Sequence, residues 1–333
     1  LSRKNIAKHL NCSAQEILFT SGGTEADNTA IISSIETYQL THAVTSSLEH
    51  HAVLHTLEHL AQSGKIKLSY VRISEIGEID LSHLDELLAN NPRSLVSLMH
   101  GNNEIGNLLP LEEVSAICRK YQAVFHSDTV QTMGHYVHDL QQLSIDFLVG
   151  AAHKFHGPKG VGFLYVNAEN KIHPFIHGGA QERNMRGGTE NVYGIVGLAK
   201  ALELAYEGME SHRKHIESLK QAMILQLVDR IPGVSFNGLS GNLEKSLYTV
   251  LNVSFPPSAE KDMLLFNLDI AKISCSGGSA CSSGTNVGSH VLQALQTDPE
   301  RGNVRFSFSK NTTLEEINYT VDVLAEIFSK ATV

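Results

Sequence analysis

Residues 145–160 read IDFLVGAAHKFHGPKG. The apolar run stops at Gly150, which is typical of a buried strand that opens into a loop. Lys154 follows at once, at the rim of a sheet, where α/β folds bind ligands. A second apolar run, residues 123–128, ends in Asp128. The segment therefore predicts a sheet edge that presents a lysine and a carboxylate.

A lysine and a carboxylate at two strand ends are the pair that a pyridoxal phosphate site requires. The lysine binds the cofactor covalently, and the carboxylate keeps the pyridine nitrogen protonated. The alternative is a surface lysine and a strand-end aspartate that share no ligand. Because short motifs carry false positives, this pair by itself leaves both interpretations open.

Strand-like and helix-like segments alternate around this stretch up to about residue 200. Such alternation predicts a mostly parallel sheet with helices on both faces. The short connection between 145–149 and 160–166 allows an antiparallel pair at one side of the sheet. The other expected strands are 17–20, 42–46, 66–71, 94–99 and 123–127, and the expected helices are 1–10, 25–36, 51–62, 81–88 and 111–121.

The C-terminal part has a different pattern. A long helical segment, 189–230, is expected to bridge two domains, either whole or with a break. After Gly233 come separate short strands at 234–236, 249–255 and 304–308, which indicate a smaller α+β domain. We expect a large domain at residues 1–207 and a small domain at residues 208–333.

Composition limits the function classes. The chain has 333 residues, of which 42% are hydrophobic and 18% charged, as in ordinary globular proteins. A net charge of -9 gives no support for a nucleic-acid or anionic-membrane partner. No apolar stretch approaches the roughly 20 residues of a membrane helix. Four cysteines without framework spacing predict a reducing compartment, hence a cytoplasmic protein, and the 18 histidines show no metal-ligand spacing.

Residues 21–24, Ser-Gly-Gly-Thr, lie between an expected strand and an expected helix. Gly23 lets the backbone approach an anion, the helix start favours phosphate, and Thr24 adds a hydroxyl donor. The alternative is an ordinary helix cap in which a serine or threonine side chain bonds the first amides.

Three further polar positions follow strands. His50 can stack on a planar ring or move protons, or it can be a helix-start histidine that faces water. Asn102 and Asn103 can orient a phenolic oxygen of the cofactor or hold a turn. Gln131, three residues after Asp128, is placed to reach the same oxygen.

Residues 274–284 read SCSGGSACSSG, a composition typical of a flexible segment. A linker has little use for cysteine, so Cys281 on this arm is a candidate nucleophile that enters a site and carries a group away. Cys275 precedes the glycines and is expected to be structural. Arg305 interrupts an apolar strand and can hold a carboxylate with two hydrogen bonds, or form a surface ion pair.

Together these motifs resemble the cysteine desulfurases of the pyridoxal-phosphate-dependent class V aminotransferase family, in particular the group that supplies sulfur for iron–sulfur clusters and nitrogenase. The resemblance spans nearly the whole chain in order and implies the type I fold of these enzymes, with a seven-stranded sheet. The matching stretches are 20–28, 49–50, 102–106, 127–131, 153–154, 178–183, 186–191, 278–281 and 304–307.

The resemblance implies conversion of L-cysteine to L-alanine with a persulfide on Cys281. It also implies a homodimer and a sulfur-acceptor protein such as an iron–sulfur scaffold. By resemblance, Lys154 would bind the cofactor covalently, Asp128 would pair with the pyridine nitrogen, His50 would stack on the ring and move protons, and Gln131 would contact the phenolic oxygen. Gly23, Thr24 and His153 would bind the phosphate, and Thr189 would bind the phosphate of the neighbouring subunit. Asn103 would orient cofactor and substrate, and Arg305 would bind the substrate carboxylate.

Two departures from the family pattern accompany the resemblance. Ala151 stands where the family has a hydroxyl residue that donates to the phosphate. The family also has a longer N-terminal segment before the part that matches Leu1, including a loop near the site. The competing interpretations are another enzyme of this fold, such as a selenocysteine lyase or an aminotransferase, and an inactive scaffold that binds partners.

Overall fold

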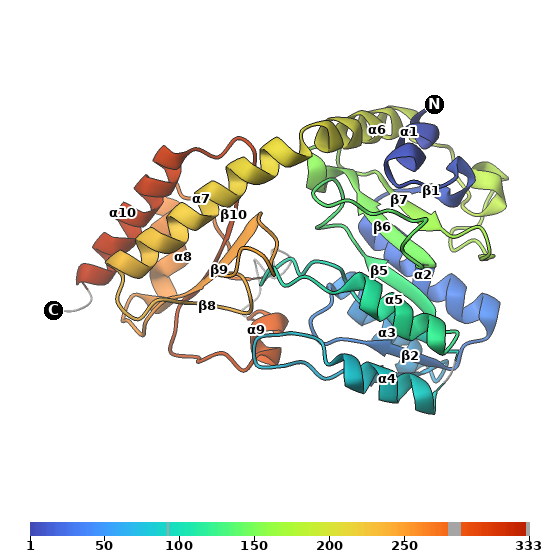
Figure 1. Ribbon diagram of the computed structural model, residues 1–333, viewed down its shortest axis with the longest axis horizontal. Helices are drawn as coiled ribbons and strands as arrows, with labels where there is room; N and C mark the ends of the chain where they lie inside the picture. Colours follow the sequence, from blue (N-terminus) through green and yellow to red (C-terminus); the bar gives the residue numbers. More distant parts are fainter. Residues whose placement is uncertain (92, 279–287, 331–333) are drawn as a thin grey trace. The chain divides into compact units, whose positions relative to one another are not determined.

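The computed structural model describes residues 1–91, 93–278 and 288–330 (Figure 1). The chain divides into two compact units. Unit 1 comprises Leu1–Arg72, Ile79–Gly101 and Leu109–Met209, and unit 2 comprises Ile73–Glu78, Asn102–Leu108 and the chain from Glu210 onward. The two short segments correct the expected division at residue 207. They belong to unit 2 because Asn107 bonds to the carbonyl of Ile76 and accepts the N–H of Leu239.

A seven-stranded sheet forms the centre of unit 1. Its order is β1-β7-β6-β5-β4-β2-β3. The pairs from β3 to β6 are parallel, whereas β7 runs antiparallel to both β6 and β1, as the short connection before it allows. The strands are β1 Ile17–Thr20, β2 His42–Thr45, β3 Lys67–Tyr70, β4 Leu95–Ser97, β5 Val124–Asp128, β6 Phe147–Ala151 and β7 Gly162–Val166.

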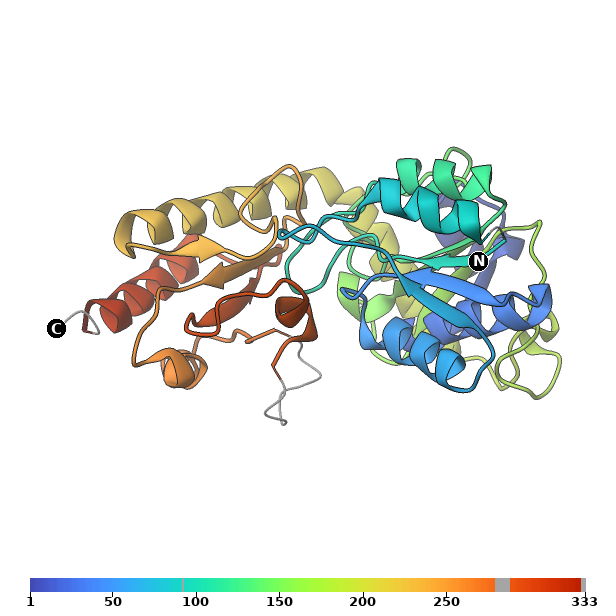
Figure 2. The same ribbon diagram turned by 90° about the horizontal axis from the view of Figure 1, so that it is seen from below.

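Helices cover both faces of this sheet. One face carries α1, α4, α5 and α6, and the other carries α2 and α3. Figure 2 shows the blue α3 and the teal α4 and α5 on opposite sides of the strands. The bounds are α1 Ser2–His9, α2 Gly23–Tyr38, α3 His51–Gln62, α4 Leu81–Asn90, α5 Leu111–Lys120 and α6 Val192–Glu207.

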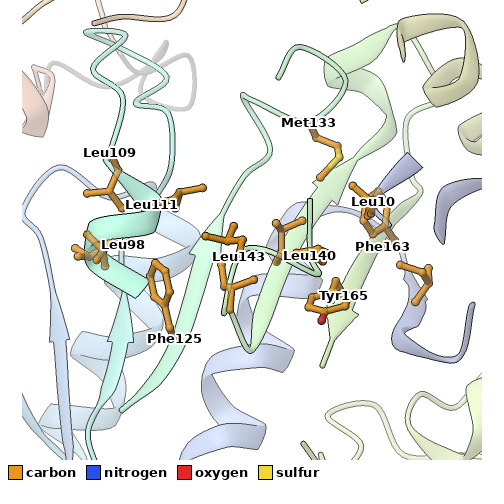
Figure 3. Packing of buried hydrophobic residues seen from close by; sticks show 14 of the residues in the cluster. Leu10, Leu98, Leu109, Leu111, Phe125, Met133, Leu140, Leu143, Phe163 and Tyr165 are labelled. Carbon is orange, nitrogen blue, oxygen red and sulfur yellow. The ribbon is translucent and has the colours of Figure 1, made fainter. Parts of the chain in front are cut away.

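Alternation along the strands explains the two-sided packing. In β7, Phe163 and Tyr165 enter the core with α1 and α6, while Leu164 enters the core with α2. The period of two residues per pleat sends neighbouring side chains to opposite faces. Figure 3 shows the larger of these cores, in which Phe125, Phe163 and Tyr165 pack with leucines from the covering helices and loops.

Unit 2 is built on a three-stranded antiparallel sheet in the order β10-β9-β8. Its elements are α7 Met209–Arg230, β8 Ser235–Phe236, β9 Val250–Ser254, α8 Leu264–Ile270, α9 His290–Ala294, β10 Asn303–Ser307 and α10 Leu314–Lys330. The expected helical segment 189–230 is two helices, because α6 ends at Glu207 and α7 begins at Met209, with Gly208 between them. Strands and helices together give the expected α+β character.

No helix in the described part of the chain is long and apolar enough to cross a membrane.

Candidate active site

The carboxyl ends of β5 and β6 bring the two deciding residues to one edge of the sheet in unit 1. The two strands are parallel neighbours, with Asp128 opposite Val149. Asp128 is the last residue of β5, and Lys154 lies in the 3-10 turn Ala152–Phe155 that follows β6 directly. Lys154 is exposed, whereas Asp128 is buried.

Burial and the neighbouring groups act on the pKa of the Asp128 carboxyl in opposite directions. Burial raises its pKa, while the Val130 N–H, which donates to Oδ1 at 2.8 Å, lowers it. The charges of His50 and Lys154 also lower the pKa of Asp128, so both side chains lie close enough to act on it. The structure therefore groups Asp128, His50 and Lys154 at one place, as the sequence predicts.

His50 has two roles in its local structure. It is the N-cap of α3, where its Nδ1 accepts the N–H of Ala52 at 3.1 Å. Because Nδ1 is an acceptor, the neutral ring carries its proton on Nε2. His50 is half-buried, so this histidine is a cap that also contributes to the site.

The glycine turn before α2 presents an uncapped helix start. Gly22 is the N-cap, and no side chain bonds the first amides. The alternative of a serine or threonine cap is therefore wrong: Thr20 Oγ1 donates to the Gly22 carbonyl, and Thr24 is exposed in the first turn. A Cβ on Gly23 would lie 2.9 Å from Val130 Cγ2, so this turn packs against the segment that follows Asp128.

The remaining cofactor candidates of unit 1 surround the same edge. Gln131 is half-buried in the turn after β5, and His153 is exposed beside Lys154. Partial burial and the charges of Lys154 and Lys159 lower the pKa of His153, which favours its neutral form. Ala151 is fully buried at the end of β6, and a Cβ on Gly23 would lie 3.7 Å from its Cβ.

Thr189 borders a cavity of about 120 Å³ in unit 1, together with Thr20, Ser21 and Arg186. Arg186 forms two hydrogen bonds to Glu25 in the first turn of α2, at 2.9 and 3.1 Å, and Glu25 Oε2 accepts the Ser21 N–H. The sequence analysis names residues 20–28 and 186–191 as motifs but does not predict the ion pair between Glu25 and Arg186. The sequence gives little sign of this ion pair, because it shows only a glutamate three residues after the glycine that begins the helix and an arginine far along the chain.

The two substrate candidates meet in unit 2. Arg305 in β10 donates from Nη1 to the backbone oxygen of Asn103 at 2.9 Å. Asn102, the preceding residue, holds the turn, because its Oδ1 accepts the N–H groups of Glu104 and Ile105. The turn interpretation is thus correct for Asn102 and leaves the half-buried Asn103 side chain for binding.

Cys281 lies outside the described residues. Cys275 is half-buried, and burial raises the pKa of its thiol to about 11, so it stays a thiol at neutral pH. The next residue, Ser276, pairs with Arg305 in an isolated antiparallel bridge.

The residues of unit 1 fit pyridoxal phosphate. An uncapped helix start and a glycine turn suit its phosphate, and Lys154 supplies the amine. Asp128 is buried and its Oδ1 accepts the Val130 N–H, so a protonated pyridine nitrogen would supply a positive partner for this carboxylate. Within the described residues, no three histidine, cysteine or acidic side chains gather as metal ligands.

Comparison with known proteins identifies the family of the chain. The family model described as aminotransferase class-V matches residues 1–320. The cysteine desulfurase IscS of Dictyoglomus turgidum is 41% identical over 333 residues, which covers 99% of this chain and 83% of that protein.

Solved structures are similar too. A structure named NifS-like protein matches with a TM-score of 0.89 at 37% identity and covers 99% of this chain and 86% of its own. A structure named SspA in complex with cysteine matches with a TM-score of 0.78 at 29% identity and covers 94% of this chain and 86% of its own.

Proposed function

The chain belongs to the class-V aminotransferase family and is a pyridoxal-phosphate-dependent cysteine desulfurase, and we propose that its site takes L-cysteine as substrate and leaves the sulfur as a persulfide on Cys281. The observation that carries this proposal is the grouping of Lys154, Asp128 and His50 at one sheet edge, beside an uncapped helix start. An aminotransferase site needs that grouping as well, so the arm that carries Cys281 selects the desulfurase reaction.

Bound pyridoxal phosphate supplies an electron sink that makes the bonds at the substrate α-carbon labile. Lys154 would hold the cofactor through its side-chain amine. Asp128 would keep the pyridine nitrogen protonated. His50, with Nδ1 committed to the Ala52 N–H, holds or releases a proton at Nε2.

Arg305 receives the substrate carboxylate in this proposal. Its guanidinium offers five N–H donors, of which one on Nη1 bonds to the Asn103 carbonyl. The planar guanidinium matches the geometry of a carboxylate, which it can bind with two parallel hydrogen bonds. Asn103 orients cofactor and substrate, and Gln131 contacts the phenolic oxygen.

The sulfur step is balanced without an external oxidant. The Cys281 thiolate forms a bond to the substrate sulfur while the carbon–sulfur bond breaks. The electron pair of that bond stays on the carbon, which takes up a proton and becomes the methyl group of alanine. One cysteine and one thiol thus give one alanine and one persulfide, which a sulfur-acceptor protein such as an iron–sulfur scaffold removes.

We also propose a homodimer. Thr189 would bind the phosphate of the neighbouring subunit, and Thr24 and His153 would bind the phosphate of their own subunit. Apolar side chains exposed at the start of α6 support this arrangement: Val192 is 59% exposed and Tyr193 is 91% exposed.

Alanine and sulfide are measured separately to test the function. Cys281→Ala should bind pyridoxal phosphate as the parent does and release no sulfide from L-cysteine with a thiol reductant present. Lys154→Ala should lose both products. Cys275→Ala is the matched control, because its half-buried thiol stays protonated at neutral pH.

Full sulfide release by Cys281→Ala would contradict the role of that residue. Release of selenide from selenocysteine, with no sulfide from cysteine, would favour a selenocysteine lyase. Absence of any cofactor binding by the parent chain would favour the scaffold.

A further inference from the structure

Three buried carboxyl groups lie together beneath the site in unit 1. Asp27 on α2 and Glu49 before α3 are each 1% exposed, and Asp128 at the end of β5 is 6% exposed. They are close enough that Asp128 acts through its charge on both of the others. Ionising all three would place three like charges in a space without water, which is strongly unfavourable.

Hydrogen-bond donors are distributed unequally among the three groups. Glu49 Oε1 accepts the Met99 N–H and the Ser46 hydroxyl, both at 3.0 Å. Asp128 Oδ1 accepts the Val130 N–H and faces the charges of His50 and Lys154. Both carboxyls have groups that favour the ionised form, but burial still raises the pKa of Glu49 to about 8.

Asp27 has no such donor in the described part of the chain. Its Oδ1 lies 3.3 Å from Nε2 of His126 on β5, but the two atoms are not aligned as a hydrogen bond. His126 is fully buried, and its Nδ1 lies 2.8 Å from the Ser97 hydroxyl. Two buried polar atoms are thus close to each other, and the position of one proton determines whether Asp27 is charged or neutral.

Asp27 is either ionised or neutral. An ionised Asp27 buries a charge beside two other carboxyls, with no donor in the described residues that is aligned to stabilise it. A neutral Asp27, with its proton on either oxygen, buries no charge beside the ring of His126, so the neutral form is preferred.

We propose that Asp27 is a positioning residue that stays protonated beside the ring of His126 and so leaves Asp128 as the carboxylate that faces the cofactor's pyridine nitrogen. This inference rests on the proposed role of Asp128 and explains why the negative charge is on Asp128. A second charge at Asp27 would repel that of Asp128 and favour protonation of Asp128.

The first test is an infrared spectrum of the apo-protein at neutral pH. The difference between the parent and Asp27→Asn should contain the C=O stretch of a protonated carboxyl, because only the parent has an acid at residue 27. A difference that contains only carboxylate bands would overturn the proposal. Burial raises the pKa of Glu49 to about 8, so Glu49 is mostly protonated in both proteins at neutral pH and its band cancels in the subtraction.

The second test is the melting temperature of the same apo-proteins against pH. Burial and the neighbouring carboxylates raise the pKa of Asp27 well above its ordinary value of 3.8. The folded state then holds a proton that the unfolded state has lost, so the parent loses stability as pH rises above about 4. Asp27→Asn has no such loss, and its melting temperature should gain on the parent as pH rises.

Asp27→Ala shows the effect of removing the buried polar group that lies beside His126. It also leaves a small cavity, so it should melt lower than Asp27→Asn at every pH. Equal destabilisation by both variants, with no dependence on pH, would overturn the proposal. None of these readouts involves cofactor or turnover, so failure here is distinguishable from failure of the desulfurase assignment.

Discussion

At the scale of residues, the sequence places the deciding side chains well and their protonation states poorly. Lys154 and Asp128 were predictable because each follows a short apolar run, and parallel strands end at one edge of a sheet. The carboxyl of Asp27 and the ring of His126 were not, because both look like ordinary polar positions in a helix and a strand. Their burial depends on which strand packs against α2, and a short stretch of sequence does not show contacts between segments far apart in the chain.

Asp128→Asn should lower the affinity for pyridoxal phosphate at least tenfold, or about 1.4 kcal/mol. An amide keeps the shape and the Val130 contact but carries no charge for the pyridine nitrogen. Fluorescence titration of the apo-protein measures the change. Unchanged affinity would mean that another group pairs with the nitrogen.

Thr24→Ala should weaken pyridoxal phosphate binding about tenfold, because it removes one hydroxyl donor to a charged group. Thr56→Ala, in the neighbouring helix α3, is the matched control, since the Thr56 hydroxyl donates to the Ala52 carbonyl of its own helix. A similar loss of affinity in both variants would point to a general effect on the helices.

At the scale of elements, buried polar contacts hold the loop that presents Asn103. Lys220 on α7 is fully buried, and its Nζ donates to the Ser246 hydroxyl and the Leu247 carbonyl, both at 2.8 Å. The Leu247 N–H in turn donates to the Gly106 carbonyl at 2.7 Å. The sequence predicts the helix 209–230 but not this anchor, because a lysine in a helix is normally exposed.

Lys220→Met should change how stability depends on pH. Burial lowers the pKa of Lys220 from 10.5 to about 7. Between these values the unfolded chain binds a proton that the folded chain lacks, so the parent gains stability as pH rises from about 7 to 10.5. The variant should lack this gain, which chemical denaturation of the apo-protein at several pH values measures.

Lys245→Met is the control for that experiment. The Lys245 side chain is 64% exposed and lies 3.6 Å from Glu78, so its loss should leave the pH dependence of the parent intact. An unaltered slope in Lys220→Met would show that Lys220 is charged in the folded protein.

At the scale of the whole molecule, the sequence predicts an α/β unit followed by an α+β unit, but not that two short upstream segments join the second. Ile73–Glu78 and Asn102–Leu108 belong to unit 2 through contacts with residues more than a hundred positions away, such as Asn252, which donates to the Glu104 carbonyl. Periodicity describes only neighbours in sequence, so it could not reveal this. Asn103 is consequently in the unit that carries Arg305.

Tyr193→Asp should convert a dimer to a monomer. It places a charge among apolar side chains at the start of α6, of which Val196 is 55% exposed. Sedimentation measures the mass, and the affinity for pyridoxal phosphate should fall with it if Thr189 reaches the neighbouring subunit. Leu225→Asp on α7, where Leu225 is 62% exposed, is the matched change and should leave the dimer intact.

The most direct test of the account is the visible absorption spectrum of the purified chain with pyridoxal phosphate, before and after addition of L-cysteine. The account predicts a coloured band that is absent from Lys154→Ala and that shifts when L-cysteine is added. A chain that stays colourless with added cofactor, or a band that L-cysteine leaves unchanged, would contradict it.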